Sequence, residues 1–486
     1  MKNNEITIIG GGVMSLTLAV IISEIFPNQK IFLIEKLKKC GLESSKGLNN
    51  AGTGHAGYCE LNYTPINSRG NIKINNAIEI NEMFEQSLQF WSYLSIKYKI
   101  FNVNSFLNKT PHISFVWGKD NVNFLQKRFL KMTKRPLFED MIFSKDPQEI
   151  KRWAPLLIEG RENLTDIAAT KVNHGTDIDF GELCIQLLKV LKKNKNFTLL
   201  LNCEVNEIIK DAKNFYKISY KKFDKKNQTI KSKKVFIGAG GMAIDLLQKT
   251  KIQNIKGYAG YPLDGEWLIC KNKYIVDKYR AKVYSNAFPG APTMSIPHLD
   301  HRVIGNHKIL LFGPFASFTT KFLNNSSKFD FFRSIKLNNL RTLFIIFLKN
   351  IPLLIYLVKQ SLLTHKGKMN YLKYFYPDAN SKDWVNLKAG KRVQIIKKSK
   401  ENKVSIEFGT EIIYSSKKNL AGLIGASPGA SVSCSVMLNV ISNFYKKESL
   451  QKKIKKIVPS YGLSLNSNPK IMREIRKKVY KNLKLK

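Results

Sequence analysis

The chain has few cysteines, and they form no pairing pattern. Its 486 residues contain six, and they lie far apart: Cys40, Cys59, Cys184, Cys203, Cys270 and Cys434. Such isolated positions provide neither the paired spacing of a zinc site nor the framework of a disulfide-rich secreted domain. This cysteine usage fits a reducing cytoplasm.

Acidic residues are scarce. There are 36 Asp and Glu against 80 Lys and Arg, which gives a formal net charge of +44. Such an excess favours polyanions, anionic membrane surfaces or small anionic substrates, although Lys, Asn and Ile are abundant throughout, as in AT-rich genomes. The cations are scattered, and no basic helix or RNA-binding aromatic motif accompanies them. These absences argue against a nucleic-acid-binding protein.

A long uninterrupted hydrophobic run is also missing. The most apolar stretch, residues 343–363, is interrupted by Lys349, Asn350 and Pro352, so it falls short of the about twenty apolar residues that cross a bilayer. We expect two short helices joined at Pro352, either packed in the core or lying in a membrane interface. We expect no cleavable signal peptide, because a core strand begins within five residues of the N-terminus.

The sequence begins instead with a strand–turn–helix–strand unit. Residues 6–9 are mostly β-branched and predict a buried strand, which residues 10–12, a glycine triplet, follow at once. Apolar residues at helical spacing occupy 16–22, and a second apolar strand, 31–34, ends at Glu35. This order is typical of a βαβ dinucleotide-binding unit.

Each position of that motif has a physical role. Gly10 allows the tight turn, and Gly12 lets backbone N–H groups approach a pyrophosphate at a helix N-terminus. Glu35 can accept hydrogen bonds from a ribose diol. Ser15 stands at the third position, where the residue only has to be small. The motif therefore predicts a bound dinucleotide.

Two further strands run into glycines and then a helix. Residues 235–237 precede Gly238 and Gly240, and residues 420–424 precede Gly425 and Gly429. A nicotinamide dehydrogenase with one such unit does not need the repeats. A flavin-binding domain uses them to close over its dinucleotide.

A loop rich in small and amide residues, 43–57, follows the second strand directly. It cannot form a packed element, but it can lie against a ligand and offer N–H groups and amides as donors. His55 lies among its glycines, so the ring is either a functional group at the ligand or an exposed loop histidine.

Here the sequence resembles the malate:quinone oxidoreductases, FAD enzymes of the glutathione-reductase-like flavoprotein group. The resemblance begins with Asn49-Asn50-Ala51-Gly52-Thr53-Gly54-His55-Ala56 and extends from Ile6 to about Ile441. Further stretches carry it: residues 59–65, 258–265, 281–284, 290–302 and 310–316. It implies oxidation of (S)-malate to oxaloacetate, with FAD as acceptor and a membrane quinone as final oxidant.

The implied fold is α/β, a glutathione-reductase-like FAD-binding Rossmann domain interleaved with a mixed α+β substrate domain. We expect the FAD domain at 1–75, 176–250 and 404–445, the substrate domain at 76–175 and 251–403, and basic C-terminal helices at 446–486. The residues expected to hold FAD are Gly10, Gly12, Ser15, Glu35, Asn50, Gly52, Thr53, Val205, Gly238, Gly240, Gly425, Pro428 and Gly429.

The reaction sets demands on the catalytic residues. A hydride must leave C2 of malate, the hydroxyl proton must go to a base, and the two carboxylates need cations. The cations of the family-like motifs are His55, Lys282, His298, Arg302 and Arg392. We expect Arg302 and Arg392 to bind carboxylates. His55 is the expected base if its loop lies under the flavin, and His298 otherwise; no metal-ligand spacing is present.

Quinone reduction adds a membrane requirement. The net charge and residues 343–363 suit a cytoplasmic protein held peripherally, and released by salt, at the inner face of the cell membrane. The main alternative is another flavoprotein of the same fold, a 2-hydroxyacid dehydrogenase or an amino-acid oxidase.

Overall fold

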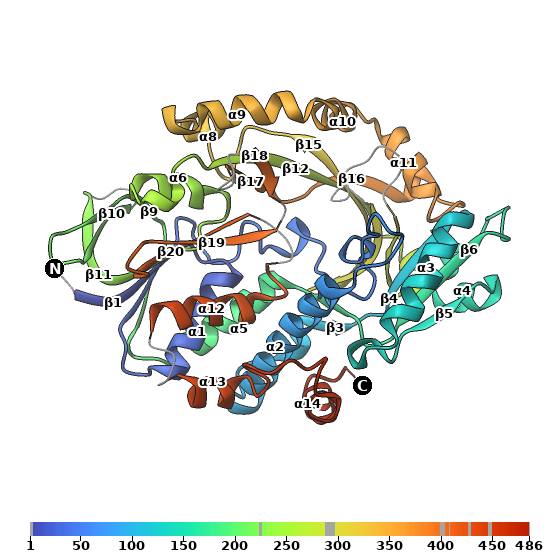
Figure 1. The fold of residues 1–486 in the computed structure, drawn as a ribbon, viewed down its shortest axis with the longest axis horizontal. Coiled ribbons are helices and arrows are strands. Elements are labelled where there is room, and N and C mark those ends of the chain that lie inside the picture. Colours follow the sequence, from blue (N-terminus) through green and yellow to red (C-terminus); the bar gives the residue numbers. More distant parts are fainter. Residues whose placement is uncertain are drawn as a thin grey trace.

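Two β-sheets form the framework of the protein. The computed structural model describes residues 3–222, 226–286, 297–398, 404–407, 409–425, 429–445 and 450–485. In Figure 1 the sheet built on the N-terminal strand lies on the left, and the second sheet extends from the top towards the right. Chain segments far apart in sequence alternate between them.

The first sheet is mainly parallel and has the order β19-β20-β11-β1-β2-β8. Its parallel strands are β1 (Asn3–Ile9), β2 (Ile31–Ile34), β8 (Phe197–Leu200), β11 (Gln228–Ile237) and β20 (Leu420–Gly425). Its antiparallel strands are β9 (Cys203–Lys210), β10 (Tyr216–Lys222) and β19 (Thr410–Tyr414). In register, Ile6 lies opposite Ile31, and Val235 lies opposite both Thr7 and Leu420.

Helices cover this sheet because its strands are apolar on both faces. Helix α1 (Val13–Ile25) packs against α5 (Phe180–Leu191) and α12 (Ser433–Phe444). Helix α6 (Ala243–Lys249) contacts β9, β11 and β20. Short connections therefore place the N-termini of α1, α6 and α12 at the carboxyl ends of β1, β11 and β20.

The second sheet is mixed and has the order β18-β17-β12-β15-β14-β13-β4-β6-β5, with β16 also paired to β12. Its strands are β4 (His112–Trp117), β5 (Ile142–Ser144), β6 (Ile167–Val172), β12 (Ala259–Cys270), β13 (Lys282–Tyr284), β14 (His298–Ile304), β15 (His307–Phe318), β16 (Trp384–Lys388), β17 (Arg392–Lys398) and β18 (Val404–Glu407). A separate pair joins β3 (Leu107–Lys109) to β7 (Thr176–Ile178).

Further helices flank the second sheet. At its right end in Figure 1 lie α3 (Lys119–Met132) and α4 (Pro147–Trp153). Helices α7 (Lys273–Lys278) and α11 (His365–Lys373) pack into an apolar core on this sheet, which also contains Ile113 of β4 and Leu268 of β12. Helix α8 (Asp330–Ser334) precedes α9 (Leu337–Lys349) and α10 (Ile351–Ser361) along the top.

Helix α2 (Asn75–Lys97) and strand β18 each pack with the domain to which the sequence does not assign them. Helix α2, expected to begin the substrate domain, packs against α12 and against α14 (Pro469–Asn482). Its buried face shares one core with α1, because Phe84 and Leu88 belong to the same apolar cluster as Leu16. Strand β18 begins at residue 404, but it pairs with β17 in the substrate sheet.

The C-terminal residues form the expected helices, α13 (Gln451–Ile457) and α14. They are not simply surface additions, because Met472, Val479 and Tyr480 are buried in the core that α2 completes. Lysines occupy the outward side.

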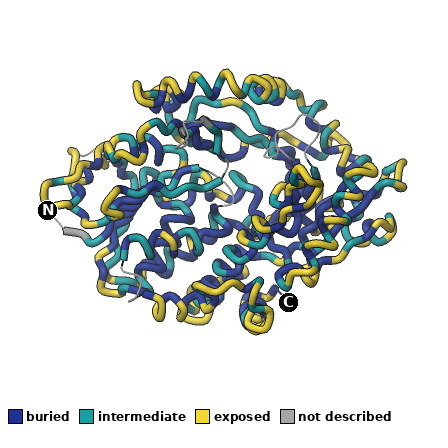
Figure 2. Tube along the Cα trace, viewed as in Figure 1, coloured by how far each residue is buried: buried dark blue, intermediate teal, exposed yellow. Residues whose placement is uncertain are grey.

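The apolar stretch 343–363 forms α9 and α10, which break at Asn350 with Pro352 in the first turn of α10. Leu343, Ile346 and Leu357 are buried, but the outward sides of both helices are exposed (Figure 2). Within the described residues no single helix is long and apolar enough to cross a membrane; α9 and α10 reach that length only as a pair bent by 76°.

Candidate cofactor and substrate site

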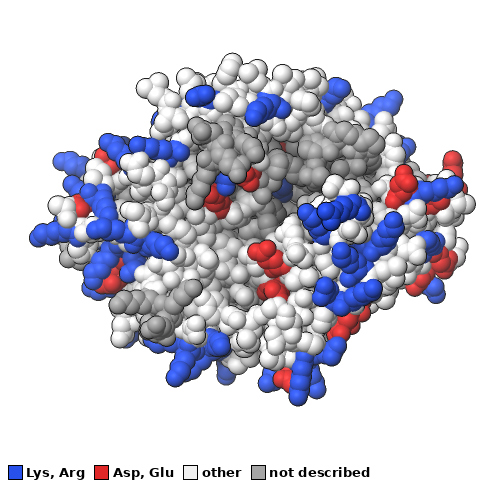
Figure 3. Space-filling view, viewed as in Figure 1, with Lys and Arg blue, Asp and Glu red and all other residues white. Residues whose placement is uncertain are grey.

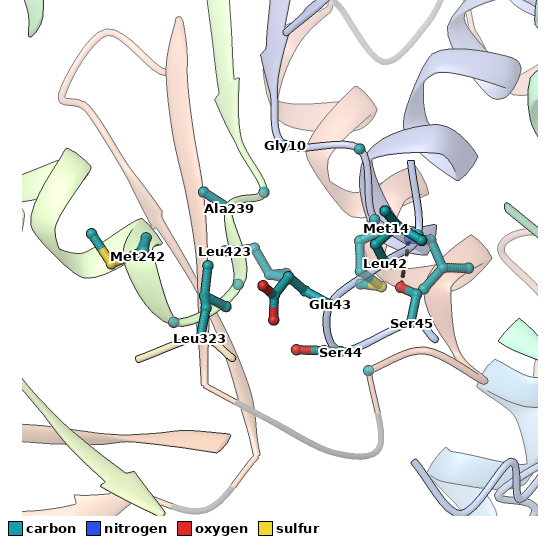
Figure 4. Close-up of a pocket in the computed structure, with 18 of the residues that line it drawn as sticks. Gly10, Met14, Leu42, Glu43, Ser44, Ser45, Ala239, Met242, Leu323 and Leu423 are labelled. Carbon is teal, nitrogen blue, oxygen red and sulfur yellow. Dashed lines mark hydrogen bonds between the residues drawn. The ribbon is translucent and has the colours of Figure 1, made fainter. Parts of the chain in front are cut away.

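The three strand–glycine turns meet at one cavity of about 330 Å³. Gly10, at φ +93°, lies so close to the turn after β11 that a Cβ placed on it would be 2.5 Å from the carbonyl oxygen of Gly238. Figure 4 shows Gly10 and Met14 on one side of the cavity and Ala239 and Met242 on the other, with Glu43 directed between them.

The N-terminus of α1 opens on this cavity. Gly12 is the N-cap residue and provides no capping side chain, and the first turn carries no acidic residue. One N–H group, that of Val13, donates to Ser45 Oγ at 3.1 Å. The remaining donors and the helix dipole favour an anion such as a pyrophosphate.

Glu35 lies at the end of β2, on the same cavity. Its carboxylate accepts hydrogen bonds from the N–H groups of Gly11 at 2.6 Å and Leu37 at 2.8 Å. Burial raises the pKa of Glu35 even so. The group is fixed where the dinucleotide motif places a ribose partner.

Most of the residues expected to hold the cofactor line this cavity. They are Gly10, Gly12, Glu35, Asn50, Gly52, Thr53, Val205, Gly238, Gly240, Gly425 and Gly429. Ser15 is buried behind the lining, where its Oγ would lie 2.2 Å from a Cβ on Gly238. Pro428 falls outside the described residues.

The loop 43–57 is held in shape by its own amide groups. Asn50 Nδ2 donates to the carbonyls of Ser44 and Lys46, and Asn50 Oδ1 accepts from the N–H of Gly52. Gly52 has a φ of +62°, and a Cβ on it would lie 2.3 Å from the guanidinium of Arg302. This position thus needs glycine for its backbone angle and for its neighbour.

A buried cluster of charged side chains contacts the loop 43–57 and holds its carbonyl groups. Asp177 lies 2.7 Å from Arg302 Nε and 2.9 Å from Lys282 Nζ, and none of the three side chains is exposed. Arg302 donates to the carbonyls of Gly47, Asn50 and Ile178, and Lys282 donates to that of Ala51. Opposite charge and carbonyl acceptors offset the cost of burying these cations.

This cluster corrects two predicted roles. The sequence predicts that Lys282 and Arg302 face the substrate, but neither lines the cavity. Asp177 pairs with both cations, and a second carboxylate, that of Asp300, lies 3.6 Å from Lys282. In this structure both side chains contact carbonyls of the loop.

His55 lies at the cavity wall and forms a pair with Glu60. Its Nδ1 is hydrogen-bonded to Glu60 Oε1 at 2.7 Å. Burial would raise the pKa of Glu60, but the hydrogen bond and charge of His55, together with the charge of His112 and a backbone hydrogen bond, hold that pKa below its ordinary value. A fixed imidazole backed by an ionised carboxylate is suited to accept a proton.

His298 is placed differently. It is buried outside the cavity lining, its ring stacks on Tyr284 at 4.2 Å between centroids, and its Nδ1 lies 2.7 Å from Asp300. Burial lowers the pKa of His298 although Asp300 opposes that effect. Tyr284 in turn shares a hydrogen bond with Thr53, at 2.8 Å.

Arg392 supplies a cation at the cavity wall. It begins β17 and lines the cavity, and no Asp or Glu among the described residues pairs with it. Burial lowers the pKa of Arg392, while Tyr284 and Tyr63 act in the opposite direction. A guanidinium without a protein carboxylate can receive one from a ligand.

Sequence reasoning missed the acidic partners of this site. Glu60 lies in the family-like stretch 59–65, five residues after His55, a spacing that could have suggested the pair. Asp300 likewise lies in a family-like stretch, 290–302, two residues after His298, with which it pairs. Asp177 had no such signal, because it is more than one hundred residues from both Lys282 and Arg302 in the chain. The assembled site combines an anion-binding helix terminus, a ribose partner, a candidate base and an unmatched guanidinium.

Comparisons with known proteins agree over the whole chain. A family model described as malate:quinone oxidoreductase matches residues 2–485. A probable malate:quinone oxidoreductase from Tolumonas auensis is 45% identical over 489 residues, covering 99% of this chain and 98% of that protein. Another, from Wigglesworthia glossinidia brevipalpis, is 46% identical over 487 residues, covering 99% and 95%.

Solved structures share the fold. L-α-glycerophosphate oxidase from Mycoplasma pneumoniae, determined with FAD bound, matches with a TM-score of 0.60 at 16% identity, covering 92% of this chain and 96% of that one. Glycine oxidase from Geobacillus kaustophilus gives 0.59 at 13% identity, with the same coverage. The expected α/β fold, a Rossmann-type domain with a mixed substrate sheet, is confirmed.

Proposed function

The chain belongs to the malate:quinone oxidoreductase family, and from this membership we propose how its own residues perform the reaction. It oxidises malate and passes the electrons to a quinone.

FAD fits the cavity at which the three glycine turns meet. The α1 N-terminus would hold the pyrophosphate, Glu35 the adenosine ribose, and Val205 and its neighbours on β9 the adenine. The loop at Asn50–Thr53 and the N-terminus of α12 would flank the flavin end. When bound, FAD supplies the acceptor for the two electrons of the malate C2–H bond.

His55 is the proposed base. It would take the proton of the malate hydroxyl, and Glu60 would orient its ring and stabilise the positive charge that forms. Arg392 would bind a malate carboxylate through paired N–H groups. Lys282, Arg302 and Asp177 would keep the loop that carries His55 in place.

The observation that carries this assignment is the hydrogen-bonded His55–Glu60 pair on a cavity that also exposes Arg392. The test is the absorption spectrum of the purified protein, mixed anaerobically with malate in a stopped-flow instrument. We expect His55→Gln to slow bleaching of the flavin by about 10²- to 10⁴-fold, and His298→Gln to retain it. The reverse result would assign the base to His298, and a wild-type protein that malate does not bleach would refute the cofactor assignment.

We also propose that the protein lies on the inner face of the cell membrane through α8, α9 and α10. Exposed apolar side chains follow these helices: Phe332, Leu337, Leu340, Phe344, Leu348, Ile351, Ile355, Val358 and Leu362. Between residues 330 and 366 the exposed charged side chains are all Lys or Arg, since Asp330 is buried. In Figure 3 the upper rim is mostly uncharged, with Lys and Arg but no Asp or Glu visible.

Such a surface matches an anionic bilayer. The apolar residues would enter the headgroup boundary, and the flanking cations would meet anionic lipids. Sedimentation with anionic vesicles at low salt tests the proposal. Phe344→Asp, at a position that is 65% exposed, should lower the bound fraction several-fold, and high salt should weaken binding of the wild type.

A matched control uses Ile96, which is 69% exposed at the far end of α2. Ile96→Asp makes a similar change away from the proposed surface and should leave vesicle binding as it is. Equal losses in the two variants, or no binding of the wild type, would contradict the membrane assignment.

A further inference from the structure

One face of β12 connects the exposed helices with the candidate site. Its odd-numbered residues point to this face: Tyr261 lies 6.3 Å, ring to ring, from Phe347 of α9, and Trp267 lies 5.7 Å from His298. Helix α9 crosses β12, β17 and β18 at the top of the molecule (Figure 1). The face therefore runs from the proposed membrane surface to the residues beside the loop.

A small second cavity lies midway along this face. It holds about 30 Å³, and its walls include Leu263, Gly265, Ala316, Gln394 and Arg392. Arg392 also lines the large cavity, so its side chain separates the two spaces. Rotation of one long side chain would join them.

Gln394, in the wall of this cavity, and Tyr261, next to it in the sheet but outside the wall, each carry a buried polar atom without a hydrogen-bond partner among the described residues. Gln394 is 2% exposed and its side-chain oxygen accepts no hydrogen bond, and the hydroxyl of Tyr261, also 2% exposed, is equally unmatched. The two residues lie directly opposite each other in the register of β12 and β17. A buried polar group without a partner costs about 1–3 kcal/mol, and such groups are few in folded proteins.

We propose that this second cavity, with Tyr261 and Gln394, receives the quinone headgroup, and that the apolar face of α9 and α10 carries its tail. The inference rests on the proposed function. A quinone ring is flat and apolar with two carbonyl acceptors, which match one hydroxyl donor and one amide, whose N and O positions are interchangeable by a flip. The cavity of about 30 Å³ is smaller than a quinone ring, so docking requires Arg392 to move aside and open it towards the large cavity.

The overall exchange balances without another reactant. Malate gives up two electrons and two protons and becomes oxaloacetate, and the quinone takes up two electrons and two protons and leaves as the quinol. Because Arg392 borders both cavities, release of oxaloacetate frees the side chain that admits the quinone. The two substrates therefore act in turn.

The test compares both half-reactions in two variants. Gln394→Leu removes the unmatched amide, and Ala316→Leu fills the cavity with added bulk. We expect each to raise the KM for a short-chain ubiquinone about tenfold, while the KM for malate and the rate of anaerobic flavin bleaching by malate stay within about twofold. Asn386→Leu makes the same amide-to-leucine exchange at an exposed position of β16 and should leave both KM values unchanged.

The possible results separate this inference from the proposed function. If malate bleaches the flavin of both variants and the quinone KM equals that of the wild type, the quinone does not dock here. If both KM values rise together, the residues serve malate or general folding, and the inference again fails. Absence of bleaching in the wild type would instead overturn the cofactor assignment on which it rests.

Discussion

Several side chains of this site work by holding other groups. Asp177 matches two buried cations, Arg302 and Lys282, and these cations hold the carbonyls of the loop beneath the large cavity. Glu60 plays the same part for His55. The ion pairs of Asp177 and Glu60 thus fix the positions of the loop and of His55, which face the large cavity.

Glu60→Gln tests this support. The variant keeps the size of the side chain but removes the charge that stabilises a protonated His55, so we expect flavin reduction by malate to slow about 10- to 100-fold. The pH at which the rate reaches half of its plateau should also change. Stopped-flow bleaching between about pH 5 and pH 9 measures both. A variant with a wild-type rate and pH profile would show that Glu60 is not part of the base.

Gly52→Ala tests the contact between the loop and Arg302. An added Cβ would lie 2.3 Å from the guanidinium, in a backbone conformation that alanine adopts at a cost of about 1 kcal/mol. Gly70, at φ +76°, has no atom of the described residues within 4 Å of a Cβ, so Gly70→Ala carries the backbone cost alone. We expect the Gly52 variant to lose several degrees more of Tm and most of its flavin. Equal Tm values would remove the steric argument.

At the residue level, local patterns are informative only about groups whose partners are near in sequence or defined by a motif. The glycines of three turns and Glu35 can be placed on one cavity in this way. The roles of Lys282 and Arg302 cannot be predicted in this way, because both side chains pair with Asp177, which comes from a distant part of the chain. A cation in a ligand-binding motif cannot be distinguished from a buried structural cation until its carboxylate partner is known.

At the level of elements, α14 packs on α2, and both helices share one apolar core with α1 and α12. Arg476 of α14 lies 2.8 Å from Glu85 of α2, and both side chains are buried. The same guanidinium donates to Asn81 and to the carbonyl of Leu137. The C-terminal helix therefore completes a core that begins in the first third of the chain.

Arg476→Met tests how firmly α14 is attached. The change leaves Glu85 buried without its cation, so we expect the free energy of unfolding to fall by about 3–5 kcal/mol. Arg473 on the same helix pairs with Glu139 at the surface, at 2.7 Å, and Arg473→Met should leave stability nearly unchanged. Urea unfolding followed by circular dichroism compares them. A small loss in the Arg476 variant would mean that this ion pair contributes little to the attachment of α14.

Amphipathic spacing predicts that α2 buries one face, but it does not identify the surface that covers that face. The sequence order therefore suggests the substrate domain for this helix, whereas Phe84 and Leu88 pack with Leu16. The break between α9 and α10 is predictable from Pro352 and its polar neighbours. The exposed fraction of each helix is not predictable from the sequence, because it depends on how far the sheet beneath the helices extends.

For the molecule as a whole, buried histidines link stability to pH. His301 is buried and His174 is largely covered, and the loss of water lowers the pKa of His174 to about 3 and that of His301 to about 4. In the unfolded chain a histidine takes up a proton below about pH 6.5. Between that pH and the folded pKa only the unfolded state binds the proton, so acid favours unfolding.

We therefore expect the free energy of unfolding to fall from about pH 6.5 to about pH 4.5, by up to about 1.4 kcal/mol per pH unit for each of these histidines. His174→Gln and His301→Gln should each reduce that slope. His307 is exposed, and His307→Gln should not alter it. Urea titrations at several pH values across this range measure the slopes, and an unchanged slope in both buried-site variants would contradict this account.

The interleaving of the chain also has a consequence for biosynthesis. Strand β1 forms its sheet with β11 on one side and β2 on the other, and β20 joins the far side of β11 only at residues 420–425. A ribosome must therefore translate most of the message before the cavity between the three glycine turns can close. Cofactor supply during expression should thus act on finished polypeptides, after release, rather than on the emerging N-terminal half.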